Sequence, residues 1–262
     1  AIILHGWEGS SDSMYVLSLG QHLFEHGFDV FRLNLRDHGD SHHLNSGLFH
    51  SCLLPEVRGA IEEIGRRYPA RRRCLVGFSL GGNFALRVGA ALPVGSTLLD
   101  RILAISPVLD PQATLLALES GNRLYRRYFI DKWRRSLRRK QRAWPQHYDF
   151  SNLPRLTNLT RMTEALVLRH TPYRTLQEYL RGYAITGEVL RHLQVRSRII
   201  ASQDDPIIPA ADLARLHPHP LLSLTLTRHG GHCGFRESLL GSAWLERMVL
   251  EDLADETAAR AG

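Results

Sequence analysis

The stretch LVGFSLGGNFAL, residues Leu75–Leu86, leads from an apolar segment through a serine between glycines into a helix-forming segment. It fits the pattern G-x-S-x-G around Ser79, and its flanks predict a strand at residues 73–78 and a helix at residues 80–92. In this setting the pattern is typical of a nucleophile elbow, a sharp turn that exposes the serine hydroxyl. The glycines lack the Cβ atoms that would clash where strand and helix cross. The stretch therefore favours Ser79 as a nucleophile over an ordinary tight turn.

Short apolar segments alternate with helical patterns on both sides of this stretch, over most of the 262 residues. Such alternation predicts an α/β fold with a mostly parallel sheet, whose strands are apolar because helices bury both faces. We expect further strands at residues 1–4, 29–35, 101–106, 197–202 and 222–227. We expect further helices at residues 13–26, 56–67 and 238–253.

One long segment, residues 110–195, interrupts this alternation. It is about 85 residues long and mostly helical in pattern, which is too long for a loop. We therefore predict a helical cap at residues 110–195, inserted between a first core part at residues 1–109 and a second at residues 196–262. Because Ala1 already lies inside an apparent strand, the chain also looks truncated at its N-terminus.

The composition, 44% hydrophobic and 23% charged, is that of a soluble globular protein. No apolar segment reaches the ~18 residues that would span a bilayer. The three cysteines are too far apart for a C-x-x-C metal site, so we expect reduced thiols and a cytoplasmic location. A loop-like segment carries four histidines, His38, His42, His43 and His50. Because no further ligand is apparent, we expect a solvated loop rim there and no metal.

A nucleophilic serine needs a base, an acid that orients this base, and donors for the oxyanion. The segments after the last two expected strands supply acids and bases in the required chain order of Ser, Asp, His. The candidates are Asp204 and Asp205 in QDDPIIP, and His229 and His232 in RHGGHCGF. His232 is favoured as the base because two glycines precede it and let the loop turn its imidazole toward Ser79.

The oxyanion donors are expected from the backbone next to Ser79 and from the loop after an early strand. The first donor is the N–H of Leu80. The segment LHGWEGS follows the first strand and carries a His-Gly pair, so the N–H of Trp7 is expected as the second donor. The alternative is that His5 and Gly6 form only a turn.

These segments, together with LNLRDHGDS and ISPVLDP, resemble the α/β-hydrolase superfamily over nearly the whole chain. The combination of LHGWEGS, GFSLGGN and GGHCGF is most similar to its YheT-like or EMB8-like branch of predicted serine esterases. The resemblance implies Ser79 as nucleophile, His232 as base, and no cofactor. In this superfamily the acid often stands four residues before a proline, which favours Asp205, four residues before Pro209, over Asp204.

The chain departs from the family pattern in two places. The segment RDHGDSHHLNSGLFHS replaces an Arg-Gly-Cys-type turn that is more frequent in this branch. The family fold also has two strands ahead of the first strand expected here, so N-terminal strands are expected to be missing.

The resemblance implies a serine hydrolase that cleaves carboxylic esters through an acyl-enzyme. Short- to medium-chain acyl esters or lipid esters are the expected substrates, and lipid metabolism is the expected setting. Two alternatives stay open: an acyltransferase that passes the acyl group to an alcohol on the same triad, and a catalytically silent hydrolase-fold binding protein.

The net charge of +7 is concentrated in one segment, residues 123–142, which carries ten Lys or Arg residues and a single Asp. As a helix this segment interleaves Leu124, Tyr128, Trp133 and Leu137 with arginines, which is an amphipathic pattern. A solvated basic face over an apolar underside is one interpretation, and attraction to an anionic membrane surface is another. No nucleic-acid motif accompanies the charge, so we do not expect a nucleic-acid partner. The expected location is cytoplasmic, with a peripheral membrane contact through residues 123–142.

Overall fold

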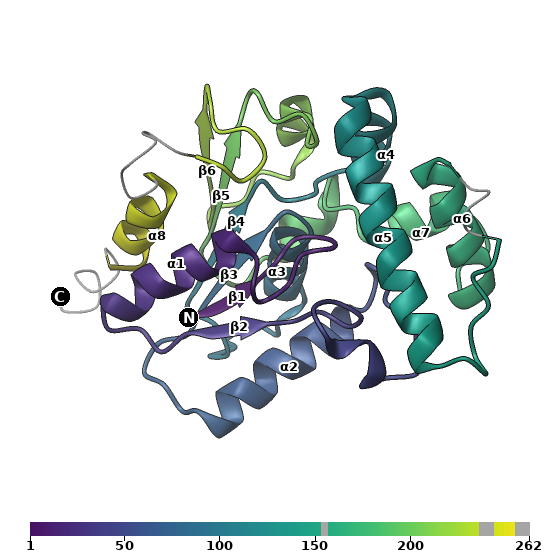
Figure 1. The fold of residues 1–262 in the computed structure, drawn as a ribbon. Coiled ribbons are helices and arrows are strands. Elements are labelled where there is room, and N and C mark those ends of the chain that lie inside the picture. The colour runs from purple at the N-terminus through teal and green to yellow at the C-terminus, as the bar shows by residue number, and fades with distance from the viewer. Residues whose placement is uncertain (153–156, 236–243, 255–262) are drawn as a thin grey trace.

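The computed structural model of the chain describes residues 1–152, 157–235 and 244–254. In these residues, six parallel strands form one sheet in the order β2-β1-β3-β4-β5-β6 (Figure 1). The strands are β1 Ile2–Leu4, β2 Phe31–Leu33, β3 Cys74–Phe78, β4 Arg101–Ile105, β5 Ser197–Ser202 and β6 Leu222–Thr227. The helices that cover the sheet are α1 Met14–Glu25, α2 Leu54–Arg67, α3 Leu80–Ala91 and α8 Trp244–Ala254. Short 3-10 helices are η1 Ser41–His43, η3 Glu188–His192 and η4 Ala210–Arg215.

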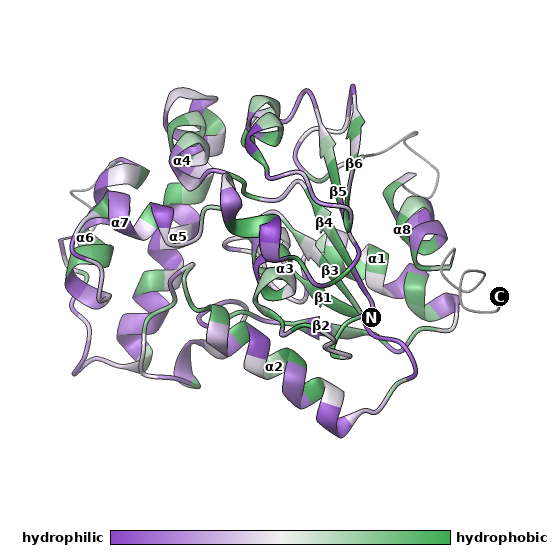
Figure 2. Cartoon of the chain, turned by 180° about the vertical axis from the view of Figure 1, so that it is seen from behind, coloured by the Kyte–Doolittle hydropathy of each residue, from purple (hydrophilic) through white to green (hydrophobic). Residues whose placement is uncertain are grey.

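Each face of the sheet has its own apolar core, because successive side chains of a strand point to opposite faces. On one face, Ile3 and Val76 pack with residues of α1 and α8. On the other face, Ile2 and Leu75 pack with residues of α2 and α3. Hydrophobic residues are accordingly concentrated along the central strands (Figure 2). The predicted α/β fold, with a parallel sheet between two layers of helices, is confirmed.

The edge strands differ from the prediction that helices bury both faces of every strand. The inner strands β1, β3 and β4 are fully buried. Strand β2 is shorter than the expected residues 29–35 and is only partly buried, and β6 leaves Leu224 and Leu226 nearly half exposed. An edge strand has only one neighbour, so less of its surface is covered by packed elements. The prediction is therefore wrong for β2 and β6. Of the expected helix 238–253, residues 238–243 lie outside the described residues.

A helical segment lies between β4 and β5 in the chain and on one side of the sheet (Figure 1). It consists of α4 Pro111–Ser120, α5 Arg123–Ala143, α6 Leu159–His170, α7 Leu176–Arg181 and η3. Its apolar residues, such as Leu118, Ile130 and Met162, join the same core that α2 and α3 pack against. We call this segment the helical insertion. The division into a cap at residues 110–195 and two core parts stays a prediction.

A buried lysine joins the helical insertion to the core. Lys140 of α5 is completely buried, although the sequence pattern placed it in a basic face. Its Nζ donates hydrogen bonds to Asp37 Oδ1 at 2.7 Å, to the Asn45 carbonyl at 2.6 Å and to the Gly47 carbonyl at 2.7 Å. All three acceptors lie in the loop between β2 and α2. Since an unpaired buried charge is costly, this contact is expected to hold the C-terminal part of α5 against the core.

Replacing Lys140 by Met should therefore destabilise the fold. The variant leaves the buried Asp37 carboxylate without its cation, and breaking a buried ion pair in this way costs about 3–5 kcal/mol of unfolding free energy. Urea unfolding followed by circular dichroism measures this loss. Arg138→Met on the exposed side of α5 is the matched control and should change stability by no more than about 0.5 kcal/mol. Equal stabilities of the two variants would contradict a structural role for Lys140.

Candidate active site

Ser79 lies at a sharp turn between β3 and α3. Its backbone has φ 52° and ψ −116°, a left-handed conformation that is unusual for a residue with a side chain. The turn is held by the Ser79 N–H, which donates to the Ile105 carbonyl of β4 at 2.8 Å. A Cβ atom on Gly77 would collide with the Gly81 carbonyl, and one on Gly81 would lie 2.5 Å from the Leu4 carbonyl. The glycines of G-x-S-x-G therefore permit the close packing that forms this turn.

The structure brings Asp205 and His232 together. His232 Nδ1 lies 2.9 Å from Asp205 Oδ2, and the carboxylate is only 2% exposed. The other oxygen, Oδ1, accepts the N–H groups of Ile207 at 2.8 Å and Ile208 at 3.0 Å. The carboxylate is thus fixed by its own backbone, with one oxygen left for the imidazole.

The neighbouring acid, Asp204, is arranged differently. Its side chain is 44% exposed and accepts the N–H groups of Gly230 at 3.0 Å and Gly231 at 2.8 Å. Its contact with His229 is longer, at 3.3 Å, and His229 is almost fully exposed. Asp204 therefore shapes the loop that carries His232, whereas Asp205 contacts the imidazole itself.

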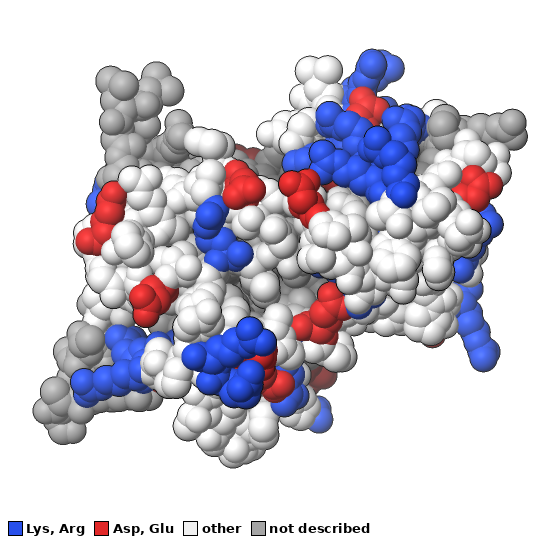
Figure 3. All heavy atoms as spheres, turned by 60° about the horizontal axis from the view of Figure 1, so that its bottom comes forward, with Lys and Arg blue, Asp and Glu red and all other residues white. Residues whose placement is uncertain are grey.

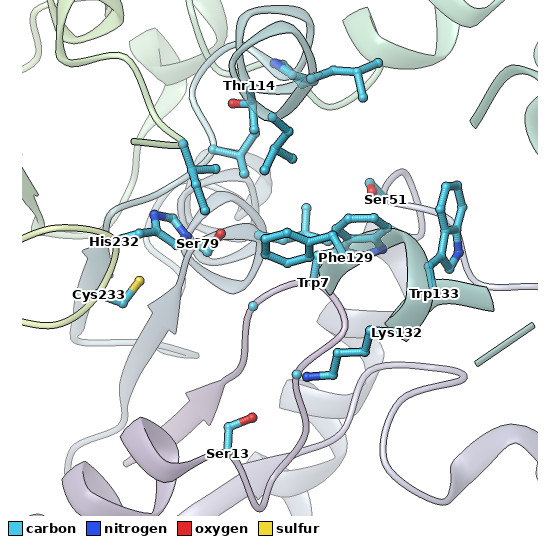
Figure 4. Close-up of a pocket in the computed structure, with 18 of the residues that line it drawn as sticks. Trp7, Ser13, Ser51, Ser79, Thr114, Phe129, Lys132, Trp133, His232 and Cys233 are labelled. Atoms are coloured by element: carbon cyan, nitrogen blue, oxygen red, sulfur yellow. The ribbon is translucent and has the colours of Figure 1, made fainter. Parts of the chain in front are cut away.

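The imidazole of His232 lies beside the Ser79 hydroxyl at one end of a cavity (Figure 4). Burial lowers the pKa of His232, but the neighbouring Cys233 sulfur and the Asp205 carboxylate more than offset burial and raise this pKa to about 10. Cys233 also lines the cavity. A charged imidazole is thus favoured at this position, as expected where a histidine takes up a proton next to a carboxylate.

The loop after β1 packs against Ser79. A Cβ atom on Gly6 would lie 3.1 Å from Ser79 Cβ, which shows how closely the loop approaches the serine. In this loop the Gly6 N–H donates to the Tyr15 hydroxyl at 3.0 Å, and the Glu8 N–H donates to His38 Nε2 at 3.1 Å. Among the hydrogen bonds of the described residues, none uses the N–H of Trp7 or of Leu80. These two N–H groups are the ones predicted from the sequence as oxyanion donors.

Two buried histidines hold this loop in place. His5 Nε2 accepts the Leu35 N–H at 3.1 Å, and its Nδ1 lies 2.7 Å from the Gly6 carbonyl. His38 is used in the same way, with Nε2 accepting from Glu8 and Nδ1 lying 2.7 Å from the Arg36 carbonyl. Each ring must therefore be neutral, with its proton on Nδ1. Burial lowers the pKa of His5 to about 4 and that of His38 well below its ordinary value.

The role of these histidines was missed in the sequence. His38 and His42 were expected on a solvated loop rim, but both are buried, so this expectation is wrong for them. His42 Nε2 lies 2.9 Å from the Ser136 hydroxyl of α5, across the interface with the helical insertion. The His-Gly pair in LHGWEGS was the available signal for His5. Nothing in the sequence marks His38, because its contact with Glu8 spans 30 residues.

The cavity beside Ser79 has a volume of about 600 Å³. It lies between the carboxyl ends of the strands and the helical insertion (Figure 4). Trp7 forms part of its wall, stacking on Phe129 at a centroid distance of 5.6 Å and meeting the edge of Trp133 at 5.1 Å. Its further apolar lining comes from Val108, Leu115, Leu118, Leu180, Tyr183 and Ile207.

The orientation of α5 partly corrects the amphipathic pattern. Trp133 and Leu137 face inward, as expected for an apolar underside. Leu124 and Tyr128, assigned to the same underside, are 76% and 52% exposed. With 3.6 residues per turn, Leu124 and Tyr128 lie on the side of α5 away from Trp133 and Leu137, so they do not face the core.

The part of the site that the structure describes contains no assembly typical of a metal centre. Within residues 1–152, 157–235 and 244–254, no three His, Cys, Asp or Glu side chains are grouped so as to hold a metal ion. Over the same residues, no helix is both long and apolar enough to cross a bilayer.

The comparison with known proteins identifies the family. The α/β-hydrolase-fold family matches residues 2–238. The chain belongs to this family, and the resemblance to it is confirmed.

Individual relatives agree with this assignment. The chain is 25% identical over 259 residues to an Escherichia coli (strain K12) protein named "Putative esterase YheT", covering 95% of this chain and 74% of that protein. It is 25% identical over 218 residues to "Monoacylglycerol lipase ABHD2" of Danio rerio, covering 74% of this chain but only 50% of the lipase. Among solved structures, the esterase Pf2001 of Pyrococcus furiosus aligns with a TM-score of 0.60 at 15% identity, over 96% of this chain and 81% of that one. The last similarity concerns the fold alone.

The neutral His38 should make stability depend on pH. Its lowered pKa means that, below about pH 6.5, the unfolded chain binds a proton that the folded protein does not. Stability that is fully present above pH 6.5 is therefore lost as the pH falls. Glutamine keeps an acceptor for the Glu8 N–H but does not titrate, so His38→Gln should lessen this loss by about 1.4 kcal/mol per pH unit between roughly pH 6 and 4.5.

Urea unfolding of both proteins over this pH range measures the difference. The exposed His43 offers a control, because His43→Gln should leave the wild-type slope unchanged. Parallel stability curves for the wild type and His38→Gln would show that His38 is not held neutral in the fold.

Proposed function

We propose that this protein is a serine hydrolase that cleaves carboxylic esters through an acyl-enzyme. The observation that carries the proposal is the buried Asp205–His232 hydrogen bond beside the Ser79 elbow. Membership of the α/β-hydrolase family, with relatives named esterase and lipase, supports a hydrolase in general. The geometry of the individual residues supports the roles that we propose for them.

In the proposed reaction, Ser79 Oγ attacks the ester carbonyl carbon while His232 Nε2 takes the hydroxyl proton. The negative charge that develops on the carbonyl oxygen is stabilised by the N–H groups of Leu80 and Trp7. His232 then gives its proton to the departing alkoxide, which leaves as an alcohol. Water attacks the acyl-enzyme as His232 takes a proton from it, and the proton returns to Ser79 when the acid is released.

Asp205 contributes to these reaction steps through the imidazole of His232. A hydrogen bond from Nδ1–H to the carboxylate leaves Nε2 as the nitrogen that can accept the Ser79 proton. The carboxylate also stabilises the imidazolium that forms in each step. Because the Ile207 and Ile208 amides hold the Asp205 carboxylate, this carboxylate is already oriented toward the imidazole before the proton is transferred.

The shape and lining of the cavity support a proposal for the substrate class. Its walls are mostly aromatic and aliphatic, and a volume of about 600 Å³ suits an acyl chain of short to medium length. One relative is named monoacylglycerol lipase, and a monoacylglycerol is a lipid ester. This name supports lipid esters as the substrates of the present protein. We therefore propose acyl esters with an uncharged, flexible acyl chain.

Ser79→Ala should lower kcat on p-nitrophenyl esters of graded chain length by on the order of 10⁴-fold or more. Alanine keeps the Cβ atom, so the turn and the melting temperature should stay unchanged. A fluorophosphonate should label the wild type on Ser79 and leave the variant unlabelled. An unlabelled, inactive wild type would favour a catalytically silent binding protein, and acyl transfer to an added alcohol at the expense of hydrolysis would favour an acyltransferase.

Asp205→Asn and Asp204→Asn form a matched pair, because Asn keeps an oxygen that accepts backbone N–H groups. Asp205→Asn should lower kcat by on the order of 10⁴-fold, since the amide favours the wrong imidazole tautomer. Asp204→Asn should retain most of the activity. In the wild type, kcat/KM should rise with pH toward the His232 pKa of about 10, because only the neutral imidazole takes a proton.

The pH profiles of the pair separate the two acids further. Loss of the Asp205 charge removes stabilisation of the imidazolium, so the residual activity of Asp205→Asn should rise at lower pH than that of the wild type. Asp204→Asn should keep the wild-type profile. A large kcat loss in Asp204→Asn with a normal Asp205→Asn enzyme would reverse the assignment.

A further inference from the structure

The outer side of α5 is strongly basic and does not pack against the core. We call the following residues the α5 outer face: Leu124, Arg127, Tyr128, Arg135, Arg138, Arg139 and Arg142, all of them exposed. Their spacing places them on one side of the helix, opposite the buried Ile130, Leu137 and Lys140. Figure 3 shows a dense group of Lys and Arg side chains over this part of the molecule.

Most of this positive charge is not neutralised by the protein. Arg127 has one acidic neighbour, Asp131, at 3.6 Å, and Arg139 contacts the fully exposed Asp40 at 3.4 Å. Arg135, Arg138 and Arg142 form no ion pair with the residues that the structure describes. Exposed pairs of this kind are weak, so the α5 outer face keeps a net positive field.

Exposed apolar side chains lie at the N-terminal end of the same face. Leu124 is 76% exposed, and Tyr128 is about half exposed. Tyr128 also lines the cavity beside Ser79, as does Met14 of α1, which is 78% exposed. Since exposed lining residues mark where a cavity opens, the mouth lies between α1 and the N-terminal part of α5. Apolar and basic surface therefore meet at the cavity mouth.

We propose that the α5 outer face docks on an anionic lipid membrane, with the cavity mouth turned toward the bilayer. A helix with arginines along it and Leu and Tyr at one end matches the composition of interfacial helices. A nucleic acid would pair with the arginines of the α5 outer face. It would leave Leu124 and the apolar mouth of the cavity exposed to water. Docking itself needs only these surface residues. Delivery of a lipid ester from the bilayer to Ser79 rests on the proposed function.

Vesicle sedimentation tests the docking. The protein should bind vesicles of mixed phosphatidylcholine and phosphatidylglycerol, bind pure phosphatidylcholine vesicles weakly, and dissociate as salt is raised. Each basic residue near such a surface contributes about fivefold to partitioning. The triple variant Arg135→Gln, Arg138→Gln, Arg142→Gln should therefore bind about a hundredfold more weakly.

The matched control removes the same charge elsewhere. Arg66→Gln, Arg67→Gln, Arg71→Gln, on and after α2, should bind vesicles as the wild type does apart from a small general loss of charge. Both triple variants should hydrolyse a soluble ester at the wild-type rate, which shows that the fold and the candidate active site are intact. Ser79→Ala should bind vesicles normally, so a failure of the proposed chemistry would leave the docking result unaffected.

Leu124→Ser tests the apolar part of the face. It should weaken binding to the mixed vesicles and leave binding to a DNA duplex unchanged. Equal binding to both kinds of vesicle, or equal loss in both triple variants, would overturn the proposal. Displacement from vesicles by millimolar inorganic phosphate at constant ionic strength would point to a site for free phosphate. Tighter binding to the DNA duplex than to vesicles, unaffected by Leu124→Ser, would assign the face to nucleic acid.

Discussion

The left-handed backbone of Ser79 is the constraint on which the rest of the site depends. It exists because β3, α3 and the end of β1 approach one another at glycine positions, where no Cβ atom keeps them apart. Gly81 allows the Leu4 carbonyl to come close, and Gly6 allows the next loop to lie against the serine. The turn thus does more than expose a hydroxyl. It brings the Leu80 amide and the loop of Trp7 to the same place, so the serine and its expected oxyanion donors share one set of close contacts.

Much of this arrangement could be predicted from sequence because each candidate residue follows a strand. Parallel strands end at one edge of the sheet, so Ser79, Asp205 and His232 are expected near one another from the sequence alone. The choice between Asp204 and Asp205 came from a family pattern, and the structure gives a physical basis for it in the Ile207 and Ile208 amides. Their catalytic roles stay predictions.

The burial of several other residues could not be predicted from local sequence patterns. The burial of His38 and Lys140 depends on partners 30 and 103 residues away, and local patterns carry no such information. Leu124 was assigned to the apolar underside of α5 because apolar residues alternate with arginines there, but the helical period places it on the side away from Trp133 and Leu137, where it is exposed. The partial exposure of β6 could not be predicted either, because its apolar alternation does not show that the strand lies at the sheet edge.

That edge position gives Asp204 a significance of its own. Edge strands and the loops that follow them are the parts of a sheet that open most readily in thermal fluctuations. The loop after β6 carries the imidazole of His232. The Gly230 and Gly231 amides of this loop donate hydrogen bonds to Asp204, which follows the inner strand β5. Fraying of β6 can therefore proceed from its outer side without carrying the imidazole away from Ser79. The position of His232 is therefore fixed from the end of β5, although the chain reaches this residue through β6.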